Sequence, residues 1–348
     1  MLILLDSSEQ NVKQEVEEIL PREDWEVFEF SASTEIIVAE LKKMKDEYSA
    51  DLQERLQTIK AVKKVISISE PFQLTSRKLK PEGSVIEVDG VKIGDGNPTI
   101  MAGPCSVEDE DQIITTAREV SQAGAEILRG GAYKPRTSPY SFQGLGEKGL
   151  KLLDLARQET GLKVITELMD IAHRDLVAKY TDIIQIGSRN MKNYSLLEAV
   201  GKLDKPVMLK RGMASPVKDW LLAAEYIMAQ GNHQVMLCER GIKTFGEKTR
   251  YTMDLSSIPL VKEKSHLPVI ADPSHGTGRW ELVPPMARAA VACGADGLLI
   301  EVHPRPEQAL SDGQQSLKPE KFARLMQEID QLKTLSPVDD ILQEAVSF

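Results

Sequence analysis

Cysteine is scarce in this sequence, and long apolar runs are missing from it. Each of these features excludes a class of protein. Only three cysteines occur among 348 residues, at the widely spaced positions Cys105, Cys238 and Cys293. An odd, scattered set does not form a disulfide framework and is typical of a reducing cytoplasm, where we expect the protein to work. No apolar run reaches the length of a membrane span, and the N-terminus lacks the basic and hydrophobic regions of a signal peptide.

Basic residues are fewer than acidic residues in this sequence. The chain has 43 Lys and Arg against 53 Asp and Glu, a net charge of −10, so we expect neither nucleic acid nor membrane as a partner. A hydrophobic content of 41% with 28% charged residues is ordinary for a globular protein. The length suits one large domain plus a small one. An acidic chain whose cations gather in a few loops is more suited to binding small anions.

Residues 1–69 are expected to form a small α+β domain. Apolar periodicity predicts strands at 1–6, 25–30, 35–41 and 62–69, with helices at 11–20 and 48–59. The order β-α-β-β-α-β is that of a ferredoxin-like fold. The segment contains no His, no Cys and no glycine-rich phosphate loop, so it carries no evident chemistry. A linker with a β-hairpin, turning at Asp89-Gly90, is expected over 70–97.

From residue 98 the pattern becomes an alternation of strands and helices. Eight apolar strands are expected at 99–103, 126–130, 163–168, 183–188, 206–211, 234–240, 268–274 and 297–303. The clearest helices between and after them fall at 110–123, 147–160, 171–180, 216–230, 281–293 and 319–335. Eight βα units over 98–335 predict the α/β class and a (β/α)8 TIM barrel. The rival, an open doubly wound sheet, often has a glycine-rich first turn, which is missing here. The tail, 336–348, gives no functional signal.

Cations cluster at the expected C-terminal ends of the strands, which form the active face of a barrel. The stretch 126–138, EILRGGAYKPRTS, places three of them in one turn and adds the hydroxyls of Thr137 and Ser138. So many cations at one mouth indicate two phosphorylated or carboxylated substrates. The alternative is that some of them pair with Glu167, Glu239 or Asp272 and are structural. The full set is Arg129, Lys134, Arg136, Arg189, Lys210, Arg211, Arg240 and Arg279.

Potential metal ligands follow the first, seventh and eighth strands: Cys105, His275, Glu301 and Asp312. The first and eighth strands become neighbours when a barrel closes, so the four side chains can converge. A mixed sulfur, nitrogen and oxygen set suits Mn²⁺, Fe²⁺, Co²⁺ or Zn²⁺. Taken singly, each residue also has a structural interpretation, and no pair has the short spacing of a metal motif.

Several other residues are expected to be structural. Cys238 and Cys293 fit core thiols, and Met208 and Met236 fit the packing of the barrel. The histidines at 173, 233 and 266 fall on helices or loops and are expected at the surface.

The motifs together resemble a known family. They are GPCSVE at 103–108, LRGGAYKPRTSPYSFQGLG at 128–146, QIGSRN at 185–190, LKRG at 209–212, CERGI at 238–242, DPSHGTGR at 272–279, and EVHP with SDGQQSL within 301–317. This set is similar to 3-deoxy-D-arabino-heptulosonate 7-phosphate (DAHP) synthases of type I, beta-like subgroup, which carry an N-terminal ferredoxin-like, ACT-like regulatory domain. The resemblance implies a transferase that condenses phosphoenolpyruvate with erythrose 4-phosphate and water, the first step of the shikimate pathway to the aromatic amino acids.

The resemblance also implies roles for individual residues. The metal ligands would be Cys105, His275, Glu301 and Asp312, and catalysis would rest on Lys134, Cys105 and His275. Phosphoenolpyruvate would be bound by Arg129, Lys134, Arg189, Lys210 and Arg240, and erythrose 4-phosphate by Arg136, Thr137 and Ser138. The family further suggests a homotetramer, inhibited by tyrosine or phenylalanine at the N-terminal domain.

Two other functions fit parts of the pattern. A 3-deoxy-D-manno-octulosonate 8-phosphate synthase performs the same chemistry on arabinose 5-phosphate, but that family resembles KANRSS where this chain has KPRTS. A non-catalytic barrel that binds a phosphorylated ligand and signals through residues 1–69 belongs to a different class. The sugar phosphate consumed with phosphoenolpyruvate would distinguish the two enzymes, and product formation without residues 1–69 would argue against the binding protein.

Overall fold

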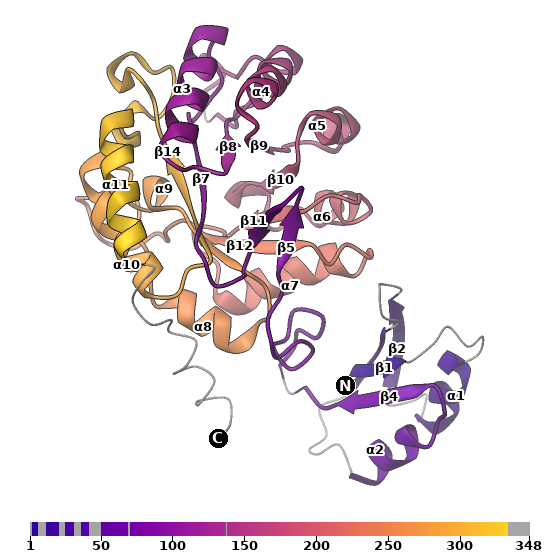
Figure 1. Ribbon diagram of the computed structural model, residues 1–348. Coiled ribbons are helices and arrows are strands. Elements are labelled where there is room, and N and C mark those ends of the chain that lie inside the picture. The colour runs from indigo at the N-terminus through magenta and orange to yellow at the C-terminus, as the bar shows by residue number, and fades with distance from the viewer. Residues whose placement is uncertain are drawn as a thin grey trace.

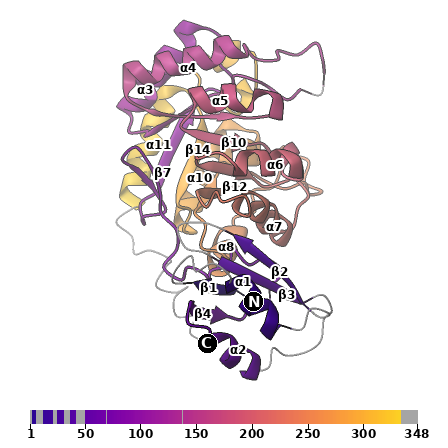
Figure 2. The same ribbon diagram turned by 90° about the vertical axis from the view of Figure 1, so that its right-hand side faces the viewer.

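The computed structural model describes residues 2–5, 12–20, 25–30, 36–41, 50–68, 70–136 and 138–332 (Figure 1). Within these ranges the chain forms a four-stranded sheet, a two-stranded hairpin and a closed eight-stranded barrel. No helix in these ranges is long and apolar enough to cross a bilayer. The two views agree that the four-stranded unit lies beside the α7 and α8 side of the barrel (Figures 1 and 2).

The N-terminal unit has the predicted ferredoxin-like order. Its elements are β1 (Leu2–Leu5), α1 (Val12–Ile19), β2 (Trp25–Phe30), β3 (Ile36–Leu41), α2 (Ala50–Gln57) and β4 (Val62–Ile66). The antiparallel sheet has the order β2-β3-β1-β4. Because side chains alternate along a strand, Ile3 packs under the helices with Val16 and Leu56, whereas Leu2 belongs to the core that includes Phe72.

The segment that follows the small unit is fastened to the outside of the barrel. Glu225 on α7 (Val217–Met228) accepts backbone hydrogen bonds from Gln73 at 3.0 Å, Leu74 at 3.1 Å and Thr75 at 2.6 Å. The Thr75 hydroxyl donates to the same carboxylate at 2.9 Å. One side chain therefore satisfies three amides that have no partner in a helix or strand.

We expect a Glu225→Ala variant to be less stable than the wild type by about 3 kcal/mol, because it leaves buried amides unsatisfied. Glu225→Gln keeps one acceptor oxygen and is expected to lose less than half of that. The measurement is thermal unfolding of both variants beside the wild type. The hydrogen bonds from residues 73–75 to Glu225 are called the Glu225 clamp below. Equal unfolding midpoints for all three proteins would show that this clamp does not stabilise the fold.

His266 corrects an expectation from the sequence. It is not a surface group but 5% exposed, and its Nε2 lies 2.7 Å from the Leu74 carbonyl oxygen. Its Nδ1 lies 2.9 Å from Ser84 Oγ. Burial lowers the pKa of His266 to about 4, so the ring is neutral at pH 7 and joins two parts of the linker segment. A lone His beside an apolar run carries no signal of such partners.

The predicted hairpin closes the bottom of the barrel. Its strands are β5 (Ile86–Val88) and β6 (Val91–Ile93), with Val88 opposite Val91. The turn at Asp89-Gly90 has φ angles of 43° and 91°, which asparagine, aspartate and glycine tolerate best. Ile86, Val88 and Ile93 pack against the inward side chains of the barrel.

The barrel has the eight parallel strands expected from the sequence, so the predicted TIM barrel is confirmed. The strands are β7 (Thr99–Gly103), β8 (Ile127–Arg129), β9 (Lys163–Glu167), β10 (Ile183–Ile186), β11 (Val207–Lys210), β12 (Val235–Glu239), β13 (Val269–Ala271) and β14 (Gly297–Glu301). The main helices that follow them are α3 (Glu110–Gln122), α4 (Glu147–Thr160), α5 (Arg174–Tyr180), α6 (Tyr194–Gly201), α7, α8 (Ser257–Lys264), α10 (Val283–Ala292) and α11 (Pro319–Leu332). Figure 1 shows these helices as an outer ring.

The strands alternate between two apolar environments. Met208 and Met236 point into the barrel interior with Cys238, as expected, whereas Leu209 and Leu237 pack outward with the helices. Cys293, expected in the core, is only partly buried at the end of α10. The alternation decides which polar residues reach the mouth, because it continues past the last apolar residue of each strand.

Candidate active site

Side chains two positions apart on a strand point to the same face, and this alternation determines which polar side chains face the mouth of the barrel. Met208 points inward, so Lys210 does as well, and Leu209 and Arg211 do not. The same rule carries seven polar side chains to the C-terminal mouth: Arg129, Glu167, Gln185, Lys210, Arg240, Asp272 and Glu301. Apolar side chains fill the interior below them.

A cavity lined by charged and polar side chains opens at this mouth. Six of the eight cations expected there line it: Arg129, Lys134, Arg136, Arg189, Lys210 and Arg240. All five residues expected to bind phosphoenolpyruvate are among them. His275 and Asp312 also line the cavity.

Arg211 and Arg279 do not line this cavity, so the expectation that they join the cationic mouth is corrected. Arg211 points outward and pairs with Glu239 at 2.9 Å and with Asp254 at 2.8 Å, as the structural alternative required. Arg279 is about half exposed and lies 3.6 Å from Glu281.

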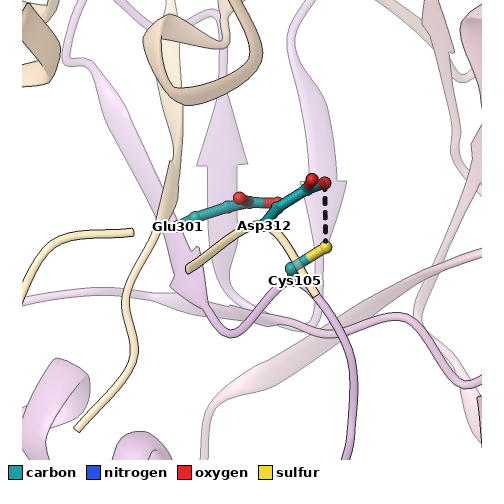
Figure 3. Close-up of side chains that lie close together, drawn as sticks. All are labelled: Cys105, Glu301 and Asp312. Carbon is teal, nitrogen blue, oxygen red and sulfur yellow. Dashed lines mark hydrogen bonds between the residues drawn. The ribbon is translucent and has the colours of Figure 1, made fainter. Parts of the chain in front are cut away.

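Three of the four candidate metal ligands converge. The ligand atoms of Cys105, Glu301 and Asp312 all lie within 4.8 Å of one another, and the Cys105 thiol donates to Asp312 at 3.4 Å (Figure 3). His275 approaches the group through Glu301, whose Oε1 lies 3.4 Å from His275 Nε2. Arg129 donates to the same Glu301 oxygen at 2.6 Å.

His275 is oriented by a carboxylate behind it. The short helix α9 (Pro273–Thr277) begins directly after Asp272, whose side chain accepts from the His275 backbone amide at 2.9 Å. Asp272 Oδ2 lies 2.8 Å from His275 Nδ1 and 2.6 Å from Lys210 Nζ. Burial alone would raise the pKa of Asp272, but His275 and Lys210 hold it well below its ordinary value. Burial lowers the pKa of His275, which favours the neutral ring that ligates metals.

The Cys105 thiol carries a proton at neutral pH even though Lys134 stands beside its sulfur. Burial, and then the charge of Glu301, raise the pKa of its thiol to about 11. Lys134 opposes this shift, because its Nζ lies 3.0 Å from Cys105 Sγ and 3.0 Å from the Cys105 carbonyl oxygen. Gly131 makes this approach possible, since a Cβ there would lie 2.8 Å from Lys134 Cδ and 2.9 Å from the Cys105 oxygen.

Three arginines at the mouth have buried guanidinium nitrogens without a hydrogen-bond partner among the described residues: Arg129 Nε, Arg136 Nη2 and Arg240 Nη1. A buried, unpaired N–H on a cation is costly, and an anionic ligand removes that cost. Arg136 is held by its Nε, which donates to the Phe142 carbonyl at 2.9 Å. Ser138 lies in the same loop, whereas Thr137 falls outside the described residues.

Arg250 and Tyr251 line the cavity and were not expected from the sequence. Tyr251 lies under Arg240, with 4.2 Å from the guanidinium carbon to the ring centre. Arg250 Nη1 is 3.4 Å from Asp312 Oδ1 and 3.2 Å from Gln315 Oε1. Both residues follow the end of β12 by more than ten positions, and the loop returns them through a bridge between Ile242 and Thr252. Counting from strand ends does not find such residues.

A closed parallel barrel with a cation-lined cavity at the C-terminal ends of its strands defines a TIM-barrel enzyme for anionic substrates. The family model described as the DAHP synthetase I family matches residues 68–335. The chain belongs to this family.

Similar proteins include enzymes of two kinds. A phospho-2-dehydro-3-deoxyheptonate aldolase of Thermotoga maritima is 50% identical over 279 residues, covering 80% of this chain and 82% of its own length. A crystal structure of the Thermotoga maritima DAHP synthase has a TM-score of 0.75 at 44% identity, covering 95% of this chain and 96% of its own. A 2-dehydro-3-deoxyphosphooctonate aldolase of Syntrophotalea carbinolica is 33% identical over 263 residues, covering 70% of this chain and 94% of its own.

Proposed function

We propose that the mouth cavity condenses phosphoenolpyruvate with erythrose 4-phosphate and water, giving 3-deoxy-D-arabino-heptulosonate 7-phosphate and inorganic phosphate. The observation that carries this proposal is the lining of seven cations, Arg250 among them, which balances two phosphates and a carboxylate. Membership of the DAHP synthetase I family supports the same reaction. Neutralising substrates that repel each other holds them close enough to react.

Within this cavity we assign the two substrates to separate groups of side chains. Arg129, Lys134, Arg189, Lys210 and Arg240 bind phosphoenolpyruvate, and the unpaired nitrogens of Arg129 and Arg240 support that assignment. Arg136, Thr137 and Ser138 bind the sugar phosphate, with the unpaired Arg136 Nη2 as the supporting feature. Lys134 of the first group and Arg136 of the second lie two positions apart in the loop after β8, as two reactants in contact require.

The donor set beside these cations fits a divalent metal ion. Cys105, Glu301 and Asp312 converge, and His275 presents a neutral ring that Asp272 orients, an arrangement common around metal-bound histidines. Mn²⁺, Fe²⁺, Co²⁺ and Zn²⁺ all accept this mixed set. When bound, such an ion supplies a Lewis acid that polarises the sugar aldehyde or orients the attacking water. Arg129 neutralises Glu301 in the same place.

Lys134 is the residue we assign to proton transfer. Its Nζ lies 3.0 Å from the Cys105 sulfur, and its side chain lines the cavity among those assigned to phosphoenolpyruvate. A lysine on its flexible stem can donate a proton as the ammonium and accept one as the neutral amine, whereas a guanidinium only carries charge.

The choice of sugar tests the proposed reaction. Purified protein is supplied with phosphoenolpyruvate and either erythrose 4-phosphate or arabinose 5-phosphate, and the sugar acid product is measured. We expect product from erythrose 4-phosphate and at least tenfold less from arabinose 5-phosphate, because the KPRTS loop differs from KANRSS. Turnover with arabinose 5-phosphate alone would move the assignment to the octulosonate enzyme.

Arg250 yields a separate prediction for this cavity. Replacing it with Met is expected to lower kcat/KM by about tenfold, the cost of one contact to a charged group. Lys192→Met is the matched control. Lys192 is exposed, its Nζ lies 2.7 Å from Asp219 Oδ2, and it does not belong to the cavity lining. Equal kcat/KM for the Arg250 variant and the wild type would show that the cavity does not use this charge.

For the N-terminal unit we propose a regulatory role, with tyrosine or phenylalanine as inhibitor and a homotetramer as the assembly. The ferredoxin-like topology supports the first part, since the described residues of this unit contribute nothing to the mouth cavity. Its attachment through the Glu225 clamp gives it a fixed connection to α7. We place the enzyme in the cytoplasm, where its three free thiols stay reduced. Inhibition assays with tyrosine, phenylalanine and tryptophan, with sedimentation analysis, test these assignments.

A further inference from the structure

A contact between two serine hydroxyls joins the chain segments that carry Cys105 and Asp312. Ser106 Oγ lies 2.6 Å from Ser311 Oγ, although 205 positions separate the two residues. Ser106 follows Cys105 directly, Ser311 precedes Asp312 directly, and both serines are buried. We infer that this serine pair positions Asp312 against Cys105 and thereby sets the affinity of the site for its metal ion. The inference rests on the metal site proposed above.

The Ser106 end of the pair belongs to a rigid segment. Val107 N donates to the Gly131 carbonyl at 3.0 Å, and Gln112 Nε2 donates to the Ser106 carbonyl at 3.1 Å. Asp109 then caps α3 by accepting from Gln112 N. The segment that carries Cys105 is therefore held by contacts to the loop after β8 and to the first turn of α3.

The Asp312 end has less support of its own. Asp312 lies in the connection from β14 to α11, between two single-turn helices, η4 (Pro306–Gln308) and η5 (Gly313–Gln315). Its φ angle of 50° is in the left-handed region, which a residue with a Cβ adopts at a cost. Among the described residues, its carboxylate makes only long contacts, 3.4 Å to Cys105 and 3.4 Å to Arg250. The Asp312 carbonyl accepts from Gln315 N at 3.1 Å within the same connection, whereas the short bond at Ser311 ties the connection to the segment that carries Cys105.

Glu108 makes a second tie to the same connection. Its Oε1 accepts from Leu310 N at 2.9 Å, and its Oε2 lies 3.5 Å from His303 Nε2. Glu108 extends from the rigid segment that also holds Ser106. Two neighbouring residues of the connection, Leu310 and Ser311, are thus fixed to the segment after β7, and Asp312 comes next.

Neither serine belongs to the described residues that line the cavity. Their effect must pass through Asp312, so they are positioning residues. Groups that orient a metal ligand without touching the metal typically change affinity by 10–100-fold.

The test is a Co²⁺ titration of the full-length metal-free protein, followed by the thiolate-to-cobalt absorption that reports the Cys105 sulfur. We expect Ser311→Ala and Ser106→Ala each to weaken Co²⁺ binding by 10–100-fold. The double variant is expected to match either single variant, because all three lose the same bond. Thr181→Val is the control. It removes a buried hydroxyl just before β10 that donates to the Val164 carbonyl on β9, and it is expected to bind Co²⁺ like the wild type.

Thermal unfolding in EDTA shows whether a variant loses Co²⁺ affinity because Asp312 is displaced or because the protein is less stable. A single variant leaves one buried hydroxyl without its partner and can be poorly folded for that reason. The double variant has no unsatisfied hydroxyl, so its Co²⁺ affinity then provides the test. Wild-type Co²⁺ affinity in the double variant would overturn the inference, and so would an equal loss in Thr181→Val. Failure of the wild type itself to bind Co²⁺ would instead overturn the proposed metal site.

Discussion

A Cys105→Ala variant is expected to lose metal-dependent turnover by about a thousandfold, together with its tightly bound metal. The thiol is the single sulfur among the proposed ligands, and a Lewis acid contributes several kcal/mol to such a transition state. The side chain is 1% exposed, so its removal leaves a small cavity and little change at the surface. The measurements are the metal content of the purified variant and its kcat with both substrates.

Cys293→Ala is the matched control for this variant, because Cys293 is a partly buried thiol at the end of α10. It is expected to keep its metal and its turnover. Retention of wild-type metal content and turnover by Cys105→Ala would remove the sulfur from the proposed ligand set.

A Lys134→Arg variant is expected to lose turnover by 10²–10⁴-fold while its KM for phosphoenolpyruvate changes only a few-fold. Arginine keeps the positive charge that attracts the substrate, but it does not exchange a proton in the reaction. The lysine is 8% exposed and 3.0 Å from Cys105 Sγ, so the charge stays in the same region. Steady-state kinetics of the Arg and Met variants separate the two roles, since Met is expected to raise KM as well.

Unchanged turnover in Lys134→Arg would eliminate proton transfer by this residue. Metal content is measured in the same samples, because Lys134 also contacts the Cys105 sulfur. A variant that keeps its metal and still loses turnover supports the assignment.

Much of the fold follows from the sequence because strand periodicity is a local signal. All eight barrel strands were expected within a few residues, and the hairpin turn at Asp89-Gly90 was placed correctly. Runs of apolar residues that are buried on both faces leave little ambiguity about parallel strands. The same regularity places Arg129, Lys210 and Arg240 at the mouth.

What the sequence analysis missed depends on the direction of side chains and on long-range contacts. Arg211 follows Lys210 directly, so the two point to opposite sides of the strand, and the inward position of Met208 shows that Lys210 is the one that faces the mouth. Applying that alternation to the sequence would have removed Arg211 from the set. Arg250 reaches the cavity because a long loop folds back, and His266 is buried by a linker nearly 200 residues away. Neither contact has a local signal.

The most direct test of the proposed metal-dependent reaction is phosphate release from phosphoenolpyruvate and erythrose 4-phosphate. The release is measured after EDTA treatment and again after Mn²⁺ is restored. We expect release only when both substrates and the metal are present, as the proposed binding of two anions beside a four-ligand metal site requires. Undiminished release after complete metal removal would contradict the proposed site, and no release under any of these conditions would contradict the proposed reaction.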